Sequence, residues 1–177
     1  LKKSYYKGNE EIIIVDLPGA YSMSPFTSEE SVTSTYVKEQ APDVIINIVD
    51  ATNLSRSLFF TTQLLELNIP VVVALNKSDL NDKKENSVDS KKLQELLKCP
   101  VVDTVSTSSK GLKKLIEEAI KVIGKEQVSV YKALDIDVST KENAELSDRH
   151  RFEFVNEIVK QVEVRHTFTN KTKPYFN

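Results

Sequence analysis

Short apolar runs alternate along this chain with longer segments whose apolar residues recur at helical spacing. Short, mostly apolar runs typical of buried strands occupy residues 11–15, 44–49, 70–75 and 101–105. Helical spacing is found over residues 28–40, 55–67, 90–98 and 110–123. Apolar strands that alternate with helices indicate a mainly parallel sheet covered on both faces, so the sequence predicts an α/β fold.

The first two strands are expected to form a hairpin rather than a parallel pair. Residues 2–7 and 11–15 flank Gly8-Asn9, a dipeptide that favours a tight turn between antiparallel strands. Residues 20–27 show no period and are expected to form a loop.

The last third of the chain changes character. Residues 135–145 are polar and are expected to form a loop, after which Ser147 or Asp148 can cap a helix that runs to about residue 164. We predict a main domain over residues 1–124, a short helical appendage over 125–164 and a linker over 165–177. One apolar stripe on the last helix is expected to pack on its own domain, with a partner interface as the alternative: Phe152, Val155, Val159 and Val162.

Composition excludes several classes of protein. A hydrophobic content of 40% suffices for a globular core, while a net charge of −2 and a pI near 5.8 argue against a nucleic-acid partner. No apolar run approaches the length of a transmembrane helix. The single cysteine, Cys99, is expected to be a buried structural thiol. The two histidines have no metal-ligand cluster around them in the sequence.

The most informative motif is Asn76-Lys77-Ser78-Asp79, directly after a predicted buried strand. Guanine offers two adjacent N–H donors that the Asp79 carboxylate can accept as a pair, whereas adenine offers no such pair. Asn76 can tie the loop to neighbouring segments, and the stem of Lys77 can lie along the base plane. A strand-end turn rich in Asn and Asp is the alternative, so the motif alone is a hypothesis.

A second motif, Asp16-Leu17-Pro18-Gly19, follows another buried-strand run. A carboxylate at the carboxyl end of a strand lies where α/β sheets bind ligands, and it can hold Mg²⁺, usually through water. Gly19 has no Cβ, so its N–H can approach a terminal phosphate closely. An ordinary Pro-Gly turn is the alternative, but the two motifs together favour a nucleotide site.

A third segment, Val105-Ser106-Thr107 and the serines after it, follows the last predicted strand. It can offer backbone N–H groups to the guanine oxygen, or its hydroxyls can cap the next helix, and both can hold at once. In one parallel sheet Asp16, Asn76 and Ser106 all follow carboxyl ends of strands. The three loops are therefore expected to converge on one rim.

Together these three motifs resemble those of the small GTPases of the P-loop class. The stretches "DVIINIVDATN" at residues 43–53 and "RSLFFTTQLLELNIPVVVALNKSD" at 56–79 are closer to the cytosolic G domain of FeoB-type ferrous iron transporters. The resemblance covers residues 2–124 well and 147–174 loosely. It implies a P-loop GTPase-like fold and a GTP-hydrolysing regulatory domain, itself soluble, on the cytoplasmic face of a bacterial inner membrane.

The resemblance also implies roles for residues. Asp16 would serve Mg²⁺ and Gly19 the γ-phosphate of GTP, and residues 20–34 would form a switch segment ordered by that phosphate. The implied partners are GTP or GDP and the membrane domain of the same transporter, and a homo-oligomer is left open. No catalytic side chain is assigned. The implied nucleotide-binding positions are Asp16, Leu17, Pro18, Gly19, Asn76, Lys77, Ser78, Asp79, Val105, Ser106 and Thr107.

Two features depart from the GTPase pattern. No Gly-x-x-x-x-Gly-Lys-[Ser/Thr] phosphate loop occurs, and because that loop comes first in the family, the chain is expected to lack an amino-terminal portion that includes a central strand. The sheet is then expected to expose apolar edges, and the chain to bind nucleotide weakly or not at all. Ala20 stands where many GTPases carry a water-orienting Gln. FeoB-type domains resemble this chain in lacking that Gln, which implies slow or differently assisted hydrolysis.

Two other functions stay open at this point. A soluble GTPase of ribosome assembly or tRNA modification is one, although the acidic pI argues against it. A degenerate, non-enzymatic GTPase module that only docks a partner is the other, and the absent phosphate loop favours it for these residues.

Overall fold

The computed structural model describes residues 2–7, 10–23, 28–77 and 86–165. Its chain opens with strands β1 (Lys2–Lys7) and β2 (Glu10–Val15), which pair antiparallel so that Lys2 lies opposite Val15. The predicted hairpin is therefore confirmed, while its Gly8-Asn9 turn lies outside the described residues.

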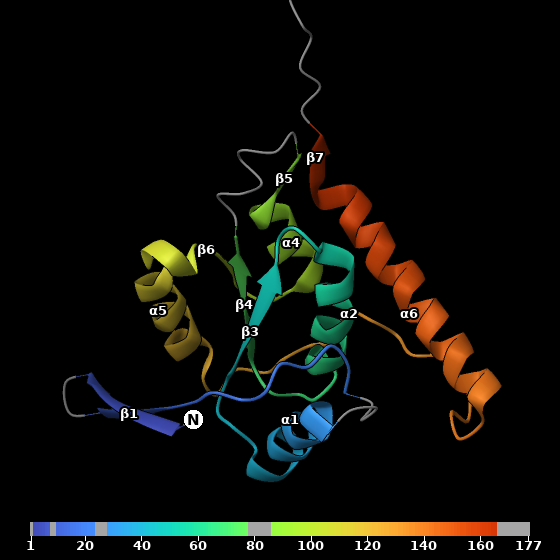
Figure 1. Ribbon diagram of the computed structural model, residues 1–177, viewed down its shortest axis with the longest axis horizontal. Coiled ribbons are helices and arrows are strands. Elements are labelled where there is room, and N and C mark those ends of the chain that lie inside the picture. Colours follow the sequence, from blue (N-terminus) through green and yellow to red (C-terminus); the bar gives the residue numbers. More distant parts are fainter. Residues whose placement is uncertain (1, 8–9, 24–27, 78–85, 166–177) are drawn as a thin grey trace, which may run out of the picture.

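A three-stranded parallel sheet forms the centre of the molecule. Its strands are β3 (Ile45–Asp50), β4 (Val71–Asn76) and β6 (Val101–Thr104), in the order β3-β4-β6 (Figure 1). Side chains alternate along the central strand β4, so that residues 71, 73 and 75 enter one core cluster and residues 72 and 74 another. Both faces of β4 are thus buried, as the unbroken apolar run predicts.

Helices cover both faces of this sheet. Helices α2 (Leu54–Leu65) and α4 (Ser90–Leu97) pack on one face, α6 (Lys141–Val162) packs on α2 and α4, and α5 (Leu112–Val122) covers the other face. Helix α1 (Ser28–Gln40) lies at the lower end of the molecule in Figure 1. The mainly parallel α/β fold predicted from the sequence is confirmed.

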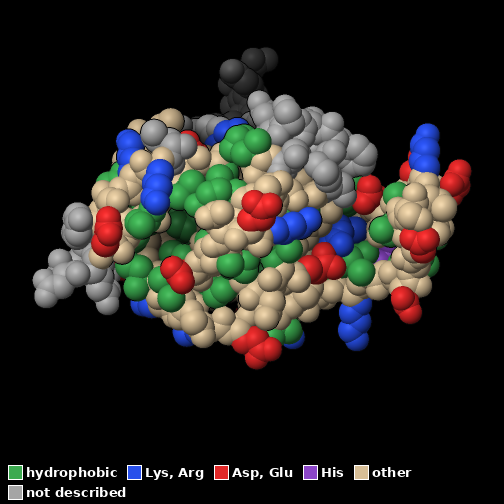
Figure 2. Space-filling model, turned by 90° about the horizontal axis from the view of Figure 1, so that it is seen from below, with side chains coloured by type: hydrophobic (Ala, Val, Ile, Leu, Met, Phe, Trp, Pro, Cys, Tyr) green, Lys and Arg blue, Asp and Glu red, His purple; other side chains and the backbone are tan. Residues whose placement is uncertain are grey.

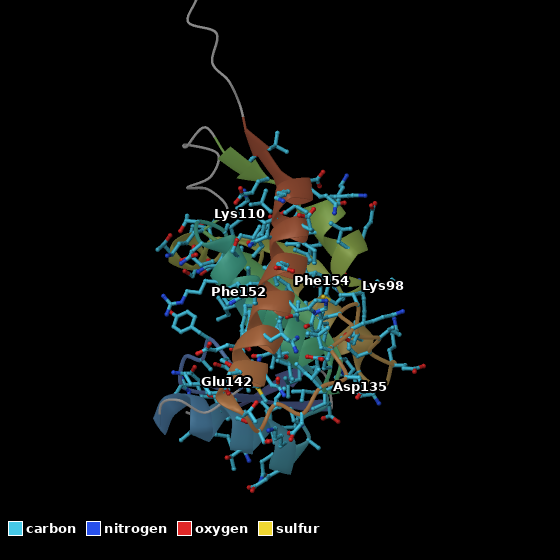
Figure 3. All side chains as sticks on the ribbon, turned by 90° about the vertical axis from the view of Figure 1, so that its right-hand side faces the viewer. Lys98, Lys110, Asp135, Glu142, Phe152 and Phe154 are labelled. Atoms are coloured by element: carbon cyan, nitrogen blue, oxygen red, sulfur yellow. The ribbon has the colours of Figure 1, made fainter. Side chains whose placement is uncertain are left out.

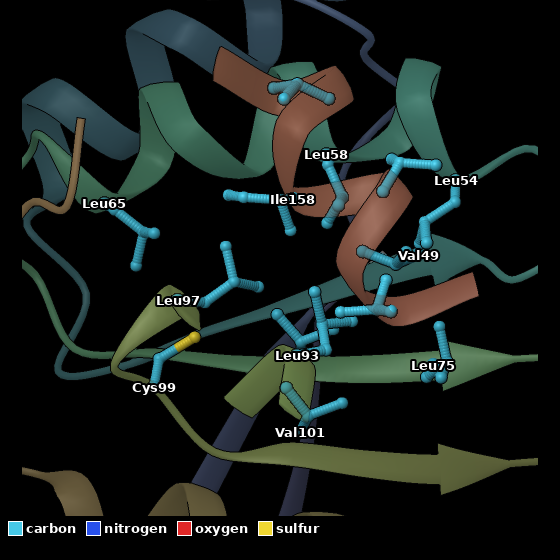
Figure 4. Close-up of a cluster of buried hydrophobic side chains, with 14 of the residues drawn as sticks. Val49, Leu54, Leu58, Leu65, Leu75, Leu93, Leu97, Cys99, Val101 and Ile158 are labelled. Atoms are coloured by element: carbon cyan, nitrogen blue, oxygen red, sulfur yellow. The ribbon is translucent and has the colours of Figure 1, made fainter. Parts of the chain in front are cut away.

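The larger core cluster lies between β4, α2, α4 and α6 (Figure 4). Its leucines include Leu58, Leu93 and Leu97, all 0% exposed, and burial of each such side chain stabilises the fold by roughly 1.5–3 kcal/mol. Cys99 belongs to the same cluster, and burial raises the pKa of its thiol to about 12. The expected buried structural thiol is confirmed.

Helix α6 is attached to α2 through a buried arginine. Arg151 forms an ion pair with Glu66 at 2.7 Å and donates a hydrogen bond to Thr62 Oγ1 at 3.2 Å. Its guanidinium also lies 4.0 Å from the centroid of the Tyr131 ring. Beyond α6, strand β7 (Glu163–Arg165) pairs antiparallel with β5 (Asn86–Val88), which holds the end of the helix beside the segment that precedes α4.

The structure corrects the predicted ends of this helix. It begins at Lys141 with Thr140 as its cap, because the Thr140 hydroxyl accepts the Asn143 N–H at 3.3 Å. The caps predicted at Ser147 and Asp148 are therefore wrong. The loop predicted over residues 135–145 is wrong from Lys141 onward, where lysine, glutamate and alanine are good helix formers. Strand β5 is not predicted from the sequence, because three residues are too few to show a period.

The apolar stripe of α6 packs on its own domain, as expected. Val155, Val159 and Val162 are buried in the core, whereas Phe152 is 41% exposed and stacks on Phe59 with ring centroids 4.3 Å apart. Figure 3 shows Phe152 and Phe154 on the face of the molecule that α6 forms.

Among the helices that the structure describes, none combines the length and the apolar character needed to cross a membrane.

The predicted single sheet is not found. Within the described residues β2 pairs only with β1, and the hairpin forms a sheet separate from β3-β4-β6. The edge of β3 and the hairpin expose apolar side chains, with Ile48 70% and Ile13 49% exposed. Figure 2 shows hydrophobic side chains gathered around a hollow on the left of the underside, where the hairpin and α5 lie in Figure 1. The expected apolar edges are therefore present.

The contacts of Arg151 lead to a prediction about stability. Replacing Arg151 by Ala leaves Glu66 unpaired beside the core and removes the contact with Tyr131, so the free energy of unfolding should fall by about 2–4 kcal/mol. Urea titration of the chain measures this change. Arg149→Ala, an exposed site two residues earlier on the helix, should change it by less than about 0.5 kcal/mol. Equal losses in the two variants would contradict a stabilising role for the contacts of Arg151.

Candidate functional site

The loops that follow β4 and β6 are joined by the side chain of Asn76. Its Oδ1 accepts the Ser106 N–H at 3.2 Å, and its Nδ2 donates to the Ser106 hydroxyl at 3.4 Å. An amide side chain can do both because it carries an acceptor and two donors. The predicted tie between these loops is therefore present, and it fixes the spacing of two strand ends that are neighbours in the sheet.

The loop after β6 is a compact turn. Val105 is buried, its N–H donates to the Lys110 carbonyl at 3.1 Å, and a short 3-10 helix, η1 (Ser106–Ser108), lies between them with Thr107 exposed. The turn closes at Gly111, whose φ is +82° and where a Cβ would collide with the Asp103 carbonyl oxygen, so glycine is required there. Gly111 is also the cap of α5 and no side chain caps that helix, so the serines do not have the alternative capping role.

Lys77 follows Asn76 and reaches across to the end of β3. Its backbone has φ +62°, a left-handed conformation that is uncommon for residues other than glycine. Its Nζ lies 2.7 Å from Oδ2 of Asp50, the last residue of β3. Burial alone would raise the pKa of Asp50, but hydrogen bonds from Lys77 and Thr52 and the charge of Lys77 outweigh it and hold that pKa below its ordinary value.

Asp50 lies beside the predicted site and is not among the positions predicted from the sequence. It ends an apolar strand in the same way as Asn76, and that position was the available signal. No pattern in the sequence, however, pairs it with a lysine 27 residues away.

The Asp16-Leu17-Pro18-Gly19 motif lies elsewhere. It follows β2 as predicted, but β2 ends opposite Lys2, near the N mark low in Figure 1, whereas the arrowheads of β3 and β4 point to the top. The Pro18 carbonyl accepts the buried Thr33 hydroxyl of α1 at 2.8 Å. Convergence on one rim is thus confirmed for Asn76 and Ser106 and wrong for Asp16, because no ladder holds β2 to the parallel sheet in the described part of the chain.

The start of the predicted switch segment contacts α2. The Arg56 guanidinium lies 3.9 Å from the centroid of the Tyr21 ring, and the Met23 N–H donates to Gln63 Oε1 at 2.8 Å. Ala20 and Met23 also pack against the larger core cluster. Residues 20–23 are therefore held by the helix whose first turn follows Asp50.

A family model described as ferrous iron transport protein B matches residues 1–119. The chain belongs to this family, FeoB. A fusion protein of Fe(2+) transport protein A and the Fe(2+) transporter FeoB from Porphyromonas gingivalis is 41% identical over 116 residues. That match covers 65% of this chain but 14% of the relative, so the chain spans about a seventh of the curated FeoB protein it matches.

Solved FeoB structures show the same fold. The cytosolic domain of L. pneumophila FeoB has a TM-score of 0.82 and 24% identity, covering 93% of this chain and 85% of that one. A GDP-bound mutant of the S. thermophilus FeoB G-domain has a TM-score of 0.71 and 27% identity, covering 92% and 86%. The P-loop GTPase-like fold class is confirmed by these likenesses.

Two predicted features of the FeoB site stay predictions. Ser78 and Asp79 lie outside the described residues, so the guanine-reading carboxylate has no described geometry. In the described part of the chain no three His, Cys, Asp or Glu side chains gather as a metal site. The exposed carboxylate of Asp16 nevertheless suits Mg²⁺, which takes one or two carboxylates together with water and phosphate oxygens.

The tie between the two loops can be tested through hydrogen exchange. Asn76→Ala removes the acceptor of the Ser106 N–H, a bond worth about 0.5–1.5 kcal/mol, so that amide should exchange about 3- to 10-fold faster. NMR-detected exchange measures the rate. Ser108→Ala removes a hydroxyl from the same short helix without touching this bond and serves as the control. An unchanged rate at Ser106 in Asn76→Ala would show that the tie does not order the loop.

Proposed function

We propose that this chain is the guanine-nucleotide-binding part of a bacterial ferrous iron transporter, in which GTP binding and hydrolysis switch the membrane part. The observation that carries the proposal is the Asn76–Ser106 tie, because it brings the two predicted base-reading loops together at the end of the sheet. Membership of the FeoB family and the likeness to a GDP-bound G-domain support it over a GTPase of ribosome assembly or tRNA modification.

In this proposal the base is selected by the loop after β4. The Asp79 carboxylate accepts two N–H groups of guanine, the stem of Lys77 covers the ring, and backbone N–H groups around Ser106 face the guanine oxygen. Adenine would leave a desolvated carboxylate without donors, which disfavours ATP strongly.

The other proposed half of the site handles phosphate and Mg²⁺. Asp16 would hold Mg²⁺ through water, and Gly19 would bring its N–H close to the γ-phosphate of GTP. Among the described residues a Cβ at Gly19 would meet nothing within 4 Å, so packing does not require glycine there and the backbone is open to a ligand. Ala20 cannot orient a water, so hydrolysis would be slow or assisted by other groups. Residues 20–34 would respond to the γ-phosphate as a switch.

Activity, cargo and location are proposed for the whole protein, because the chain spans 14% of the P. gingivalis relative. Ferrous iron would be the cargo, the membrane domain of the same protein the partner, and the cytoplasmic face of the bacterial inner membrane the location.

Guanine selectivity gives the first test. The full-length gene product should bind GDP and GTP in preference to ATP, and Asp79→Ala should abolish that preference by weakening the guanine nucleotides at least tenfold, the loss expected when a charged bidentate pair is removed. Calorimetric titration measures the affinities, with Asp135→Ala as a charge-matched control. If the preference for guanine nucleotides survives in Asp79→Ala, the assignment of guanine selection to Asp79 is wrong. If the gene product binds no guanine nucleotide, the result would favour a docking module.

The 177 residues alone should bind GDP weakly or not at all. They contain no phosphate loop, and the Asp16 motif lies away from the base-reading rim, so the phosphates gain few contacts. The same titration on this chain checks the expectation. Tight, micromolar or better, GDP binding by the chain would contradict it.

A further inference from the structure

The Asp50 carboxylate divides its two oxygens between a turn and a lysine. Oδ1 accepts both the N–H and the hydroxyl of Thr52, at 2.9 and 2.7 Å. Oδ2 accepts the Lys77 ammonium at 2.7 Å. The first oxygen thus fixes the carboxylate within its own turn, and the second holds a side chain of a different loop.

The backbone around Asp50 fixes its position further. The Asp50 N–H donates to the Ser57 hydroxyl at 3.2 Å, and the Asp50 carbonyl accepts the Asn53 N–H at 3.0 Å. The Ala51 N–H donates to the Asn76 carbonyl at 3.0 Å, which joins this turn to the loop after β4. The turn is therefore bonded both to α2 and to the base-reading loop.

Because Asp50 is fixed in this way, its ion pair also fixes the side chain of Lys77. Its Cα belongs to the β4 end and its ammonium lies at the β3 end, so its stem crosses between two strand ends that are paired as Asp50 and Asn76. The side chains of Lys77 and Asp50 are 48% and 34% exposed, so the stem lies at the surface of the rim and not in the core. A free lysine stem samples many rotamers, and pairing with a fixed carboxylate removes most of them before a ligand arrives.

We propose that Asp50 is a positioning residue for guanine recognition: it holds the Lys77 ammonium so that the lysine stem forms a preformed apolar surface for the purine ring. This inference rests on the proposed function. It adds a residue of the β3–α2 turn to a site otherwise built from the loops after β4 and β6. Asp50 acts through Lys77 and does not itself contact the nucleotide.

The test combines two substitutions in the full-length gene product, with GDP as the probe. Asp50→Asn keeps an oxygen for Thr52 but presents no charge to Lys77, and GDP affinity should fall about 3- to 5-fold, the upper part of the range of an exposed ion pair. Lys77→Met keeps an apolar stem and loses the ammonium. In that background Asp50→Asn should change GDP affinity by less than about twofold, because no ion pair remains to be lost.

Asp135→Asn supplies the control for charge. Asp135 is exposed and lies near the bottom of Figure 3, whereas Lys110, which bonds to the loop after β6, lies near the top. This variant should leave GDP affinity unchanged. Urea midpoints of all variants confirm that each one folds.

Each outcome decides the proposal. A loss in Asp50→Asn that disappears in the Lys77→Met background supports it. An equal loss in both backgrounds would show that Asp50 only stabilises its turn, and a gain in affinity would show that the ion pair competes with the nucleotide; both overturn it. A wild-type protein that binds no GDP overturns the proposed function and this inference together, whereas wild-type binding with unaffected Asp50→Asn overturns only the inference.

Discussion

Burial of the central strand β4 on both faces is the constraint on which the rest of the structure depends. Alternate residues of β4 enter two core clusters, one under α2, α4 and α6 and one under α5. The strand can neither slide nor rotate without exposing one of these sets. Its carboxyl end is therefore a fixed point, and Asn76 and Lys77, which leave it, start from defined positions.

Helix α2 transmits this order to the rest of the fold through polar contacts at both of its ends. Its first turns carry Ser57, which bonds to Asp50, and Arg56, which lies over Tyr21. Its last turn leads to Glu66, which pairs with the buried Arg151 of α6. Helix α2 thus contacts residues 20–23, the turn at Asp50 and helix α6, and it joins these three parts of the molecule.

The sequence predicts what depends on local pattern and misses what depends on distant partners. The apolar run of β4 and the polar residues directly after it were sufficient to place Asn76 at a strand end, and the alternation of strands and helices was sufficient for the fold class. Strands β5 and β7 were missed because each has three residues that acquire strand geometry only by pairing across the chain. The start of α6 was missed because residues 141–145 are mostly polar, although lysine, glutamate and alanine among them are good helix formers. Asp50 was missed because its partner lies 27 residues away.

The two halves of the proposed nucleotide site have different mechanical support, and this difference explains why one prediction of convergence succeeded and the other failed. The loops after β3, β4 and β6 leave adjacent strands of one hydrogen-bonded ladder, so backbone bonding fixes their spacing before any side chain contributes. The Asp16 motif leaves a hairpin whose ladder is its own, and its position follows from contacts with α1 and α2 instead. In the proposed site a base would therefore meet a surface formed by adjacent strand ends, whereas the phosphate side would require β2 to be held against the parallel sheet. In the proposed function, guanine selection and the response to phosphate would thus be separable, because they would depend on different sheets.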